Sequence, residues 1–388
     1  MQSYLEKLLC ELISINSSNP DYSDISPGEH EIGQFIYDLF RKNNIDSIKQ
    51  EVELKRSNII AKVSSNPQYS SNKKKQAILL CSHLDTVFID GMRFAPELKN
   101  GFIYGPGSCD TKSSLAVMIA ALIEYSKLAK RSYDAFFLGA VSEESRHLGI
   151  RKFIEEYKDI TSGIDLCIIG EPTSLDLGIA HKGSLKFTIR TEGKSAHGST
   201  PQMGVNAINM MSDIISNINS ELIPLYDNLA DEILGKATLN IGVIKGGRAF
   251  NIVPDFCSIE LDRRVLPSET IDDVLKGFKD VIHKTAKGRA DFIASVDKVN
   301  DYIPFLKTDI SSLEFIRLLK SCRKIYPGSK QAGLPYATDG GFTCQAGIQT
   351  VVFGPGDIKN CHTLEEYVST NELFTAFEII KNYLLQIG

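Results

Sequence analysis

The sequence lacks the features that mark a membrane or secreted protein. No apolar run approaches the roughly 20 residues that a membrane-spanning helix needs, and the longest lies around Leu115–Ile123. The N-terminal segment carries charged and apolar residues at helical spacing and has no signal-peptide core. We therefore expect a cytoplasmic protein with no membrane partner.

Two further absences concern basic charge and cysteine pairs. The 48 acidic residues outnumber the 43 basic ones and give a formal charge of -5, whereas a general nucleic-acid binder usually has a basic face. The eight cysteines include no CxxC pair, which in a long chain without a signal peptide favours reduced thiols over a disulfide framework. Nucleic acid is therefore not an expected partner. Tryptophan is absent as well, but this excludes no function.

What the sequence contains is a chain of 388 residues, 43% of them hydrophobic, which is enough for roughly two or three domains. In the first half, segments with helical spacing alternate with short apolar runs. The helical segments are 2–15, 29–43 and 112–128, and the apolar runs are 57–63, 77–81, 135–141 and 166–169. This alternation predicts an α/β domain with a mostly parallel sheet and helices on both faces.

A different order of elements begins near Lys182. Strand patterns at 185–191, 237–244, 257–263 and 291–296 and helical patterns at 205–218 and 271–286 give the order βαββαβ. This order is that of the ferredoxin-like split βαβ sandwich. We expect this inserted domain to span residues 183–296.

The pattern of the first half then returns. We predict a helix near 311–324, a strand at 350–353 and a last helix from Thr370, where Ser369 and Glu372 have the spacing of a capping box. The α/β domain would thus consist of residues 1–182 and 297–388. Ser64–Lys75 is low in complexity and is interpreted as a solvated loop.

Several polar residues lie directly beyond predicted strands, where open α/β sheets build their ligand sites. His83 and Asp85 follow the strand that ends near Cys81, and in an extended chain they face the same side. His83 could bind a metal while Asp85 orients it, although a His–Asp hydrogen bond on a loop is the alternative. Asp110 enters a helix after a glycine-rich run, where a helix N-cap is the simpler interpretation.

Three more strand ends carry carboxylates and a histidine. Glu143 and Glu144 follow the strand that ends at Val141, Glu171 follows the next strand, and His362 follows the last. Because adjacent glutamates cannot point the same way, one could bind metal while the other stays free as a general base; a solvated acidic loop is the alternative. Two histidines and three carboxylates suit zinc but exceed the ligands of one tetrahedral ion. They favour two metals that share a bridging carboxylate.

The runs HLDTV, GPGSCDTK, SEES, GEPT and CHTLEEY together resemble the motifs of a known family. It is the acetylornithine deacetylase, succinyl-diaminopimelate desuccinylase and carboxypeptidase G group of di-zinc amidohydrolases, and the resemblance covers nearly the whole chain. It implies that Asp110 bridges two Zn²⁺ ions, for which Co²⁺ can substitute. His83 and Glu171 would complete one metal site, and Glu144 and His362 the other.

The resemblance also implies roles for the remaining residues. Glu143 would be the general base, and Asp85 would orient His83. The runs AHKGSLKF, GKSAHGSTPQMGVNAI and GGRAFNIVPDFCSIELDRRVLP are similar to the family's lid domain, which implies a homodimer in which His197 crosses to the partner subunit and stabilises the oxyanion. The implied substrate-binding residues are Lys182, Asn251, Arg264, Asp339 and Gly340. By itself, the sequence favours a solvated loop histidine for His197 and allows an ion pair for Arg264.

The implied reaction is metal-dependent hydrolysis of the amide bond of an N-acyl amino acid. In the family, deacylases and carboxypeptidases tend to have glutamate at the position of Glu171, whereas aminopeptidases have aspartate. The runs GEPTSLDLGIAHKG, VNAI and FGPGDIKNCHTLEEY look most like acetylornithine deacetylase, an enzyme of arginine biosynthesis. Cys361 and the loop YATDGGF depart from it, and the loop resembles the desuccinylase and carboxypeptidase branches. A desuccinylase or a carboxypeptidase is therefore the alternative function. A metal-binding protein without catalysis is a remote alternative.

Overall fold

The computed structural model describes residues 1–66 and 76–386, which divide into two compact units. The first unit comprises Met1–Ala180, Lys307–Gly333 and Thr338–Gly388, and the second comprises His181–Leu306 and Leu334–Ala337. The predicted domain bounds stay a prediction, because compactness does not show that either part folds by itself. Most of the predicted loop Ser64–Lys75 lies outside the described residues.

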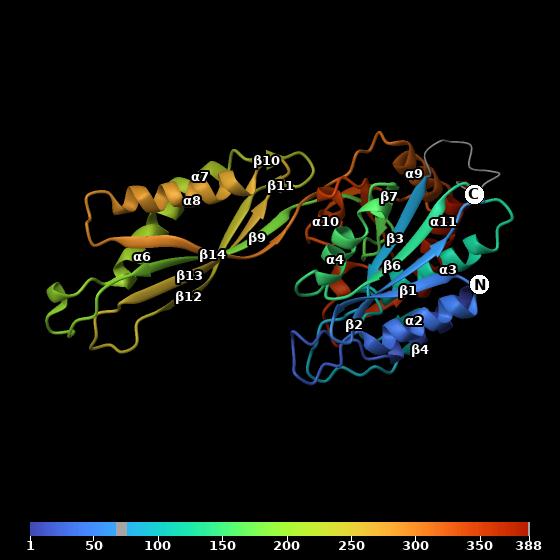
Figure 1. Ribbon diagram of the computed structural model, residues 1–388, viewed down its shortest axis with the longest axis horizontal. Helices are drawn as coiled ribbons and strands as arrows, with labels where there is room; N and C mark the ends of the chain where they lie inside the picture. Colours follow the sequence, from blue (N-terminus) through green and yellow to red (C-terminus); the bar gives the residue numbers. More distant parts are fainter. Residues whose placement is uncertain (67–75, 387–388) are drawn as a thin grey trace. The chain divides into compact units, whose positions relative to one another are not determined.

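A mixed sheet of nine strands forms the centre of the first unit (Figure 1). Its order is β1 (Asp46–Glu53), β2 (Arg56–Val63), β6 (Asp134–Ala140), β3 (Ala77–His83), β7 (Ile164–Ile169), β17 (Thr350–Val352), β8 (Leu177–His181) and β15 (Leu306–Lys307), with β16 (Gln331–Leu334) paired to β8. Strands β6, β3, β7 and β17 are parallel, whereas β1, β2 and β8 join antiparallel. The predicted α/β fold is confirmed, and its parallel strands occupy the middle of the sheet.

Helices cover both faces of this sheet (Figure 1). One face carries α1 (Gln2–Ser14), α2 (His30–Lys42), α3 (Lys112–Ser126), α9 (Leu313–Ile325) and α11 (Thr370–Gln386), and the other carries α4 (Leu148–Glu156) and α10 (Gly340–Gln345). A short helix, α5 (Lys158–Thr161), follows α4.

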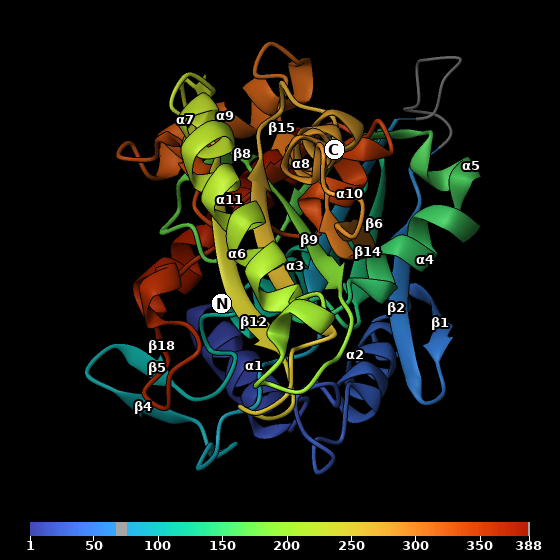
Figure 2. The same cartoon turned by 90° about the vertical axis from the view of Figure 1, so that its left-hand side faces the viewer.

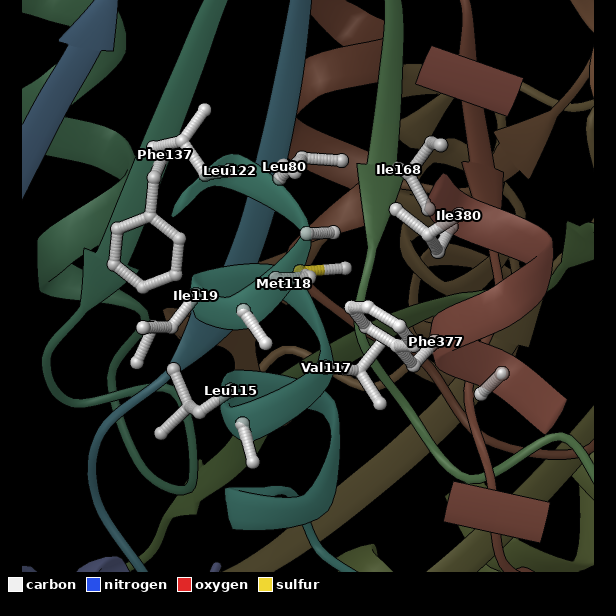
Figure 3. Packing of buried hydrophobic residues seen from close by; sticks show 14 of the residues in the cluster. Leu80, Leu115, Val117, Met118, Ile119, Leu122, Phe137, Ile168, Phe377 and Ile380 are labelled. Atoms are coloured by element: carbon white, nitrogen blue, oxygen red, sulfur yellow. The ribbon is translucent and has the colours of Figure 1, made fainter. Parts of the chain in front are cut away.

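Helix α3 lies at the centre of the core. It is buried from Lys112 to Ile123, as expected for a helix that is apolar nearly all round. Its apolar side chains lie between Phe137 of β6 and Phe377 of α11 (Figure 3). This packing gives the residues just before α3, including Asp110, a rigid support.

A separate sheet of three strands joins two distant parts of the first unit. Strand β18 (Tyr367–Ser369) pairs with β5 (Phe102–Tyr104), which pairs with β4 (Glu97–Lys99). Ser369 Oγ accepts a hydrogen bond from the Glu372 N–H at 3.5 Å, which is one half of the predicted capping box. The other half would be a bond from the Ser369 N–H to the Glu372 carboxylate. That carboxylate instead accepts the N–H of Gly356, in the loop after β17.

The second unit has the predicted βαββαβ order. Its elements are β9 (Gly183–Glu192), α6 (Ala207–Asn217), β12 (Thr238–Gly246), β13 (Phe256–Val265), α8 (Ile271–Ala286) and β14 (Ile293–Ile303), with smaller elements that include α7 (Ile223–Tyr226), β10 (Ala230–Asp231) and β11 (Gly235–Lys236) between α6 and β12. The four-stranded antiparallel sheet has the order β12–β13–β9–β14. Helices α6 and α8 contact each other and pack on its strands (Figures 1 and 2). In the strand order given above, β12 lies at one edge of the sheet.

Within the described part of the chain, no helix has both the length and the apolar character needed to cross a membrane.

We predict that Phe377→Ala destabilises the first unit by about 3–5 kcal/mol, because the ring is fully buried against α3 and its removal leaves a cavity. Leu385→Ala on the same helix is the control, since Leu385 is 46% exposed. Differential scanning calorimetry should show a lower melting temperature only for Phe377→Ala. Equal melting temperatures of both variants would contradict the packing described.

Candidate metal centre

Polar side chains gather where the parallel strands end. His83 is the last residue of β3, Glu143 and Glu144 follow β6, and Glu171 follows β7. Because the carboxyl ends of parallel strands share one edge of a sheet, these side chains lie close together. Asp110 joins them from the loop before α3.

Asp110 lies between two histidines. Its Oδ1 is 3.0 Å from Nε2 of His83, and its Oδ2 is 3.3 Å from Nε2 of His362. His83 Nε2 is also 3.8 Å from Glu171 Oε1, and His362 Nε2 is 3.3 Å from Glu144 Oε2. The structure thus forms two three-residue groups that share Asp110, and in each of them the ligand atoms lie within 4.8 Å of one another.

The orientation of His83 is set by the backbone. Its Nδ1 lies 2.8 Å from the carbonyl oxygen of Asp85, so this nitrogen carries the proton in the neutral ring and donates it. The Nε2 lone pair then faces the carboxylates, as a metal ligand requires. The side chain of Asp85 lies farther away, with Oδ1 3.6 Å from His83 Nδ1.

The Asp85 carboxylate instead holds the loop after β6. It accepts the backbone N–H groups of Glu143 and Glu144, each at 3.1 Å, and the side-chain amide of Asn19 at 2.7 Å. Asp85 is 1% exposed. It therefore positions both adjacent glutamates through the backbone. No pattern in the sequence indicates this contact of Asn19.

Glu143 and Glu144 point to different surroundings. Glu144 belongs to the group of Asp110 and His362, whereas Glu143 forms a third group with His147 and Asp339. His147 Nδ1 is 2.9 Å from Asp339 Oδ1 and 3.7 Å from Glu143 Oε1. His147 could not be predicted from the sequence, since nothing in the run SEESRHLG shows that this histidine is buried.

Glu366 is a further residue whose role the sequence did not show. It is 2% exposed and accepts the backbone N–H groups of Gly107, Cys109 and Asp110 at 3.0, 2.8 and 2.8 Å. Pairing of β18 with β5 brings it to this loop. The run CHTLEEY thus supplies both His362 and the carboxylate that holds the loop of Asp110.

Burial and mutual repulsion dominate the electrostatics of the site. Burial raises the pKa of Glu143, Glu144 and Glu171, and neighbouring carboxylates add to it. Burial opposes the charge of His83, but Glu171 and Asp110 raise its pKa well above the ordinary value. The hydrogen bond with Asp110 raises the pKa of His362 to about 10.

The donor set fits divalent metal ions. Imidazole and carboxylate ligands in two groups with a shared aspartate match a pair of ions. Several buried carboxylates without an equal number of cationic side chains are costly unless cations neutralise them. The predicted ligands His83, Asp110, Glu144, Glu171 and His362 are all brought together in these groups.

The other predicted site residues fall into two sets. Asp339 and Gly340 lie in the first unit at the start of α10, and Asp339 contacts His147 there. Lys182, His197, Asn251 and Arg264 belong to the second unit. Within that unit the loops that carry His197 and Asn251 are joined by an isolated bridge, in which the Gly198 N–H donates to the Asn251 carbonyl and His197 pairs with Ile252. Arg264 forms an ion pair with Asp262 at 3.0 Å.

Comparisons with known proteins agree with this architecture. A family model described as a peptidase dimerisation domain matches residues 179–290. A peptidase M20 domain-containing protein of Schizosaccharomyces pombe is 30% identical over 386 residues, which cover 96% of this chain and 84% of that protein. The acetylornithine deacetylase of Proteus mirabilis is 33% identical over 329 residues, which cover 79% and 80%. The crystal structure of the aminopeptidase PepT of Bacillus cereus matches with a TM-score of 0.78 at 21% identity, over 100% of this chain and 99% of that one, and so shares the fold.

We predict that zinc binds the metal-free protein more tightly as the pH rises. Without metal, the neighbouring carboxylates raise the pKa of His83 and raise that of His362 to about 10. Protons therefore compete with zinc for these rings, and both rings must be neutral to bind it. Isothermal titration calorimetry in buffers of different ionisation enthalpy should therefore show proton release. An affinity that stays constant between about pH 6 and pH 9 would contradict this electrostatic description.

Glu366→Gln should weaken metal binding by about ten- to a hundredfold. The amide nitrogen of glutamine would face backbone N–H groups that need an acceptor, so the loop of Asp110 would shift. Competition with a chromophoric zinc chelator measures the affinity. Glu314→Gln is the control, because Glu314 is also buried and accepts the hydroxyls of Tyr133 and Tyr383 away from the candidate ligands. A control that lost metal equally would show that Glu366 acts only through global stability.

Proposed function

The chain belongs to the M20 peptidase family of metal-dependent hydrolases, and on this basis we propose that it removes the acyl group of an N-acyl amino acid. N-acetyl-L-ornithine is the proposed substrate, and L-ornithine and acetate are the products. The observation that carries the proposal is the placement of Asp110 between His83 and His362, with Glu143 next to the candidate ligand Glu144 on the loop after β6.

The proposed cofactor is a pair of Zn²⁺ ions. His83 and Glu171 would hold one ion, Glu144 and His362 the other, and Asp110 both. When bound, such ions polarise the amide carbonyl and make water more acidic. Imidazole with carboxylate ligands supports zinc, and Co²⁺ favours similar ligands.

In the proposed mechanism, Glu143 moves the proton. Its carboxylate accepts a proton from the attacking water and then delivers it to the nitrogen of the leaving amine. Asp85 keeps the Glu143 backbone in place through the N–H that it accepts. Burial raises the pKa of Glu143, which favours the protonated form that serves the second step.

His197 is the proposed donor to the oxyanion. The Ser199 N–H donates to His197 Nδ1 at 3.2 Å, so the proton of the neutral ring lies on Nε2, where it can be donated. Lys182, Asn251 and Arg264 of the same unit, with Asp339 and Gly340 of the first unit, are proposed to bind the substrate. The match to a dimerisation domain and the open edge strand β12 support a homodimer through the second unit, in which His197 acts on the partner's site.

The choice of acetylornithine has two supports. Glu171 occupies the position where deacylases of this family have glutamate, and one similar protein is an acetylornithine deacetylase. A role in arginine biosynthesis and a cytoplasmic location follow from the same proposal. The alternative is a desuccinylase or carboxypeptidase of the family, favoured by the sequence Thr338-Asp339-Gly340.

We predict that Glu143→Gln lowers kcat by about a hundred- to ten-thousandfold while metal content stays unchanged, because the proton acceptor is lost. Activity is measured as ornithine released from N-acetyl-L-ornithine by the zinc-loaded protein, and metal content by mass spectrometry. Glu155→Gln is the matched control, since Glu155 is exposed on the neighbouring helix α4. Full activity of Glu143→Gln would refute its role as general base.

A panel of N-acetyl, N-succinyl and dipeptide substrates compared by kcat/KM tests the substrate. A preference for N-succinyl substrates or dipeptides would replace acetylornithine by the alternative. Inactivity of the zinc-loaded native protein on the whole panel would favour a metal-binding protein without catalysis.

A further inference from the structure

We propose that His147 and Asp339 are positioning residues that hold the Glu143 carboxylate in the place from which it reacts. This inference rests on the proposed function of Glu143. It concerns the third group at the sheet edge, whose members come from the loop after β6 and from the start of α10.

The Glu143 carboxylate lacks support of other kinds. Its side chain is 11% exposed, yet among the described residues no hydrogen bond reaches its oxygens. The backbone of Glu143 is fixed by Asp85, but this bond does not hold the carboxylate itself. The carboxylate has an electrostatic contact with His147, whose Nδ1 lies 3.7 Å from Oε1 while its proton is directed to Asp339.

His147 itself is held firmly. Its ring is 4% exposed, Nδ1 lies 2.9 Å from Asp339 Oδ1, and its centroid is 5.3 Å from that of Phe342. Its backbone has a φ of 53°, a left-handed conformation that side chains seldom adopt. This unfavourable backbone conformation places Nδ1 of the ring beside both Glu143 and Asp339.

One nitrogen of the ring faces two carboxylates, because His147 Nδ1 lies 2.9 Å from Asp339 Oδ1 and 3.7 Å from Glu143 Oε1. The ligand atoms of Glu143, His147 and Asp339 all lie within 4.8 Å of one another. Without the imidazole N–H beside them, nothing in this group would offset the charge of the two carboxylates, and like charges at that distance repel. Glu143 would then turn away from the position that the ring now defines. Asp339 acts on Glu143 only indirectly. Its carboxylate accepts the Nδ1 proton of His147 and so fixes the orientation of the ring.

The test uses two substitutions that tolerate a positive φ. His147→Gly removes the ring without backbone strain, whereas His147→Asn keeps a donor near the place of Nδ1 and also tolerates this backbone. In the zinc-loaded protein we expect His147→Gly to lower kcat by about ten- to a hundredfold, a loss typical for residues that orient a functional group. KM and metal content should stay unchanged, and His147→Asn should recover most of the activity.

Asp339→Asn separates positioning from substrate binding. A positioning residue lowers kcat, whereas a residue that binds the substrate equally in the ground state and the transition state raises KM. We expect Asp339→Asn to lower kcat and to add little to the loss in His147→Gly, because the two residues act as one unit. A raised KM with unchanged kcat would overturn this positioning role and would leave Asp339 with the substrate-binding role proposed above.

Crystal structures of native protein and His147→Gly provide a readout that does not depend on the substrate. We expect the Glu143 side chain to leave its native position in the variant. An unchanged Glu143 position would overturn the inference, as would equal loss of activity in the glycine and asparagine variants. Binding of a third zinc ion that His147→Gly abolishes would also overturn it, because the group would then be a metal site.

If His147→Gly fails to fold, His147→Gln replaces it, since glutamine carries its amide beyond the Nδ1 position. Inactivity of the native protein would refute the proposed function alone, and the crystal structures would still decide the inference.

Discussion

Buried negative charge at the carboxyl edge of the nine-stranded sheet is the constraint on which the site depends. Asp110, Glu144 and Glu171 surround His83 and His362 there, and burial raises the pKa of both glutamates. Charges of one sign are stable in such a place only when partners of the opposite sign compensate them. Two divalent cations would supply that compensation, and binding them would stabilise the folded first unit as well as equip it for chemistry.

The carboxylates of the site repel one another, and hydrogen bonds to the backbone hold the loops that carry them in place. The Asp110 loop is held by Glu366 through three backbone N–H groups, and the loop of Glu143 and Glu144 is held by Asp85. Both bracing groups are themselves buried carboxylates that bind backbone rather than metal. Their hydrogen bonds satisfy backbone donors that would otherwise be unpaired in a dry environment. The ligands are thereby fixed at the backbone, and only their side chains need to adjust to an ion.

The elements with strong local signals could be predicted from the sequence. Helix α3 carries the apolar run Leu115–Ile123, and the parallel strands β3, β6 and β7 are short apolar runs, so their type and order follow from composition and spacing. Strand β1 was missed, because it lies at the edge and several of its side chains are exposed, which leaves little hydrophobic pattern. Helix α10 was also missed, because a single short turn rich in glycine carries no helical period.

The sequence by itself determined the fold class of the first unit, the βαββαβ order of the second, and the set of carboxylates and histidines that follow the strands. These depend on local hydrophobic period and on chain order, which one segment expresses alone. Only the tertiary structure decided which oxygen of Asp110 faces which histidine, that Glu143 turns to His147 and Asp339, and that Glu366 holds the Asp110 loop. Those contacts join segments up to 259 positions apart. They depend on distances between packed elements, which no local pattern encodes.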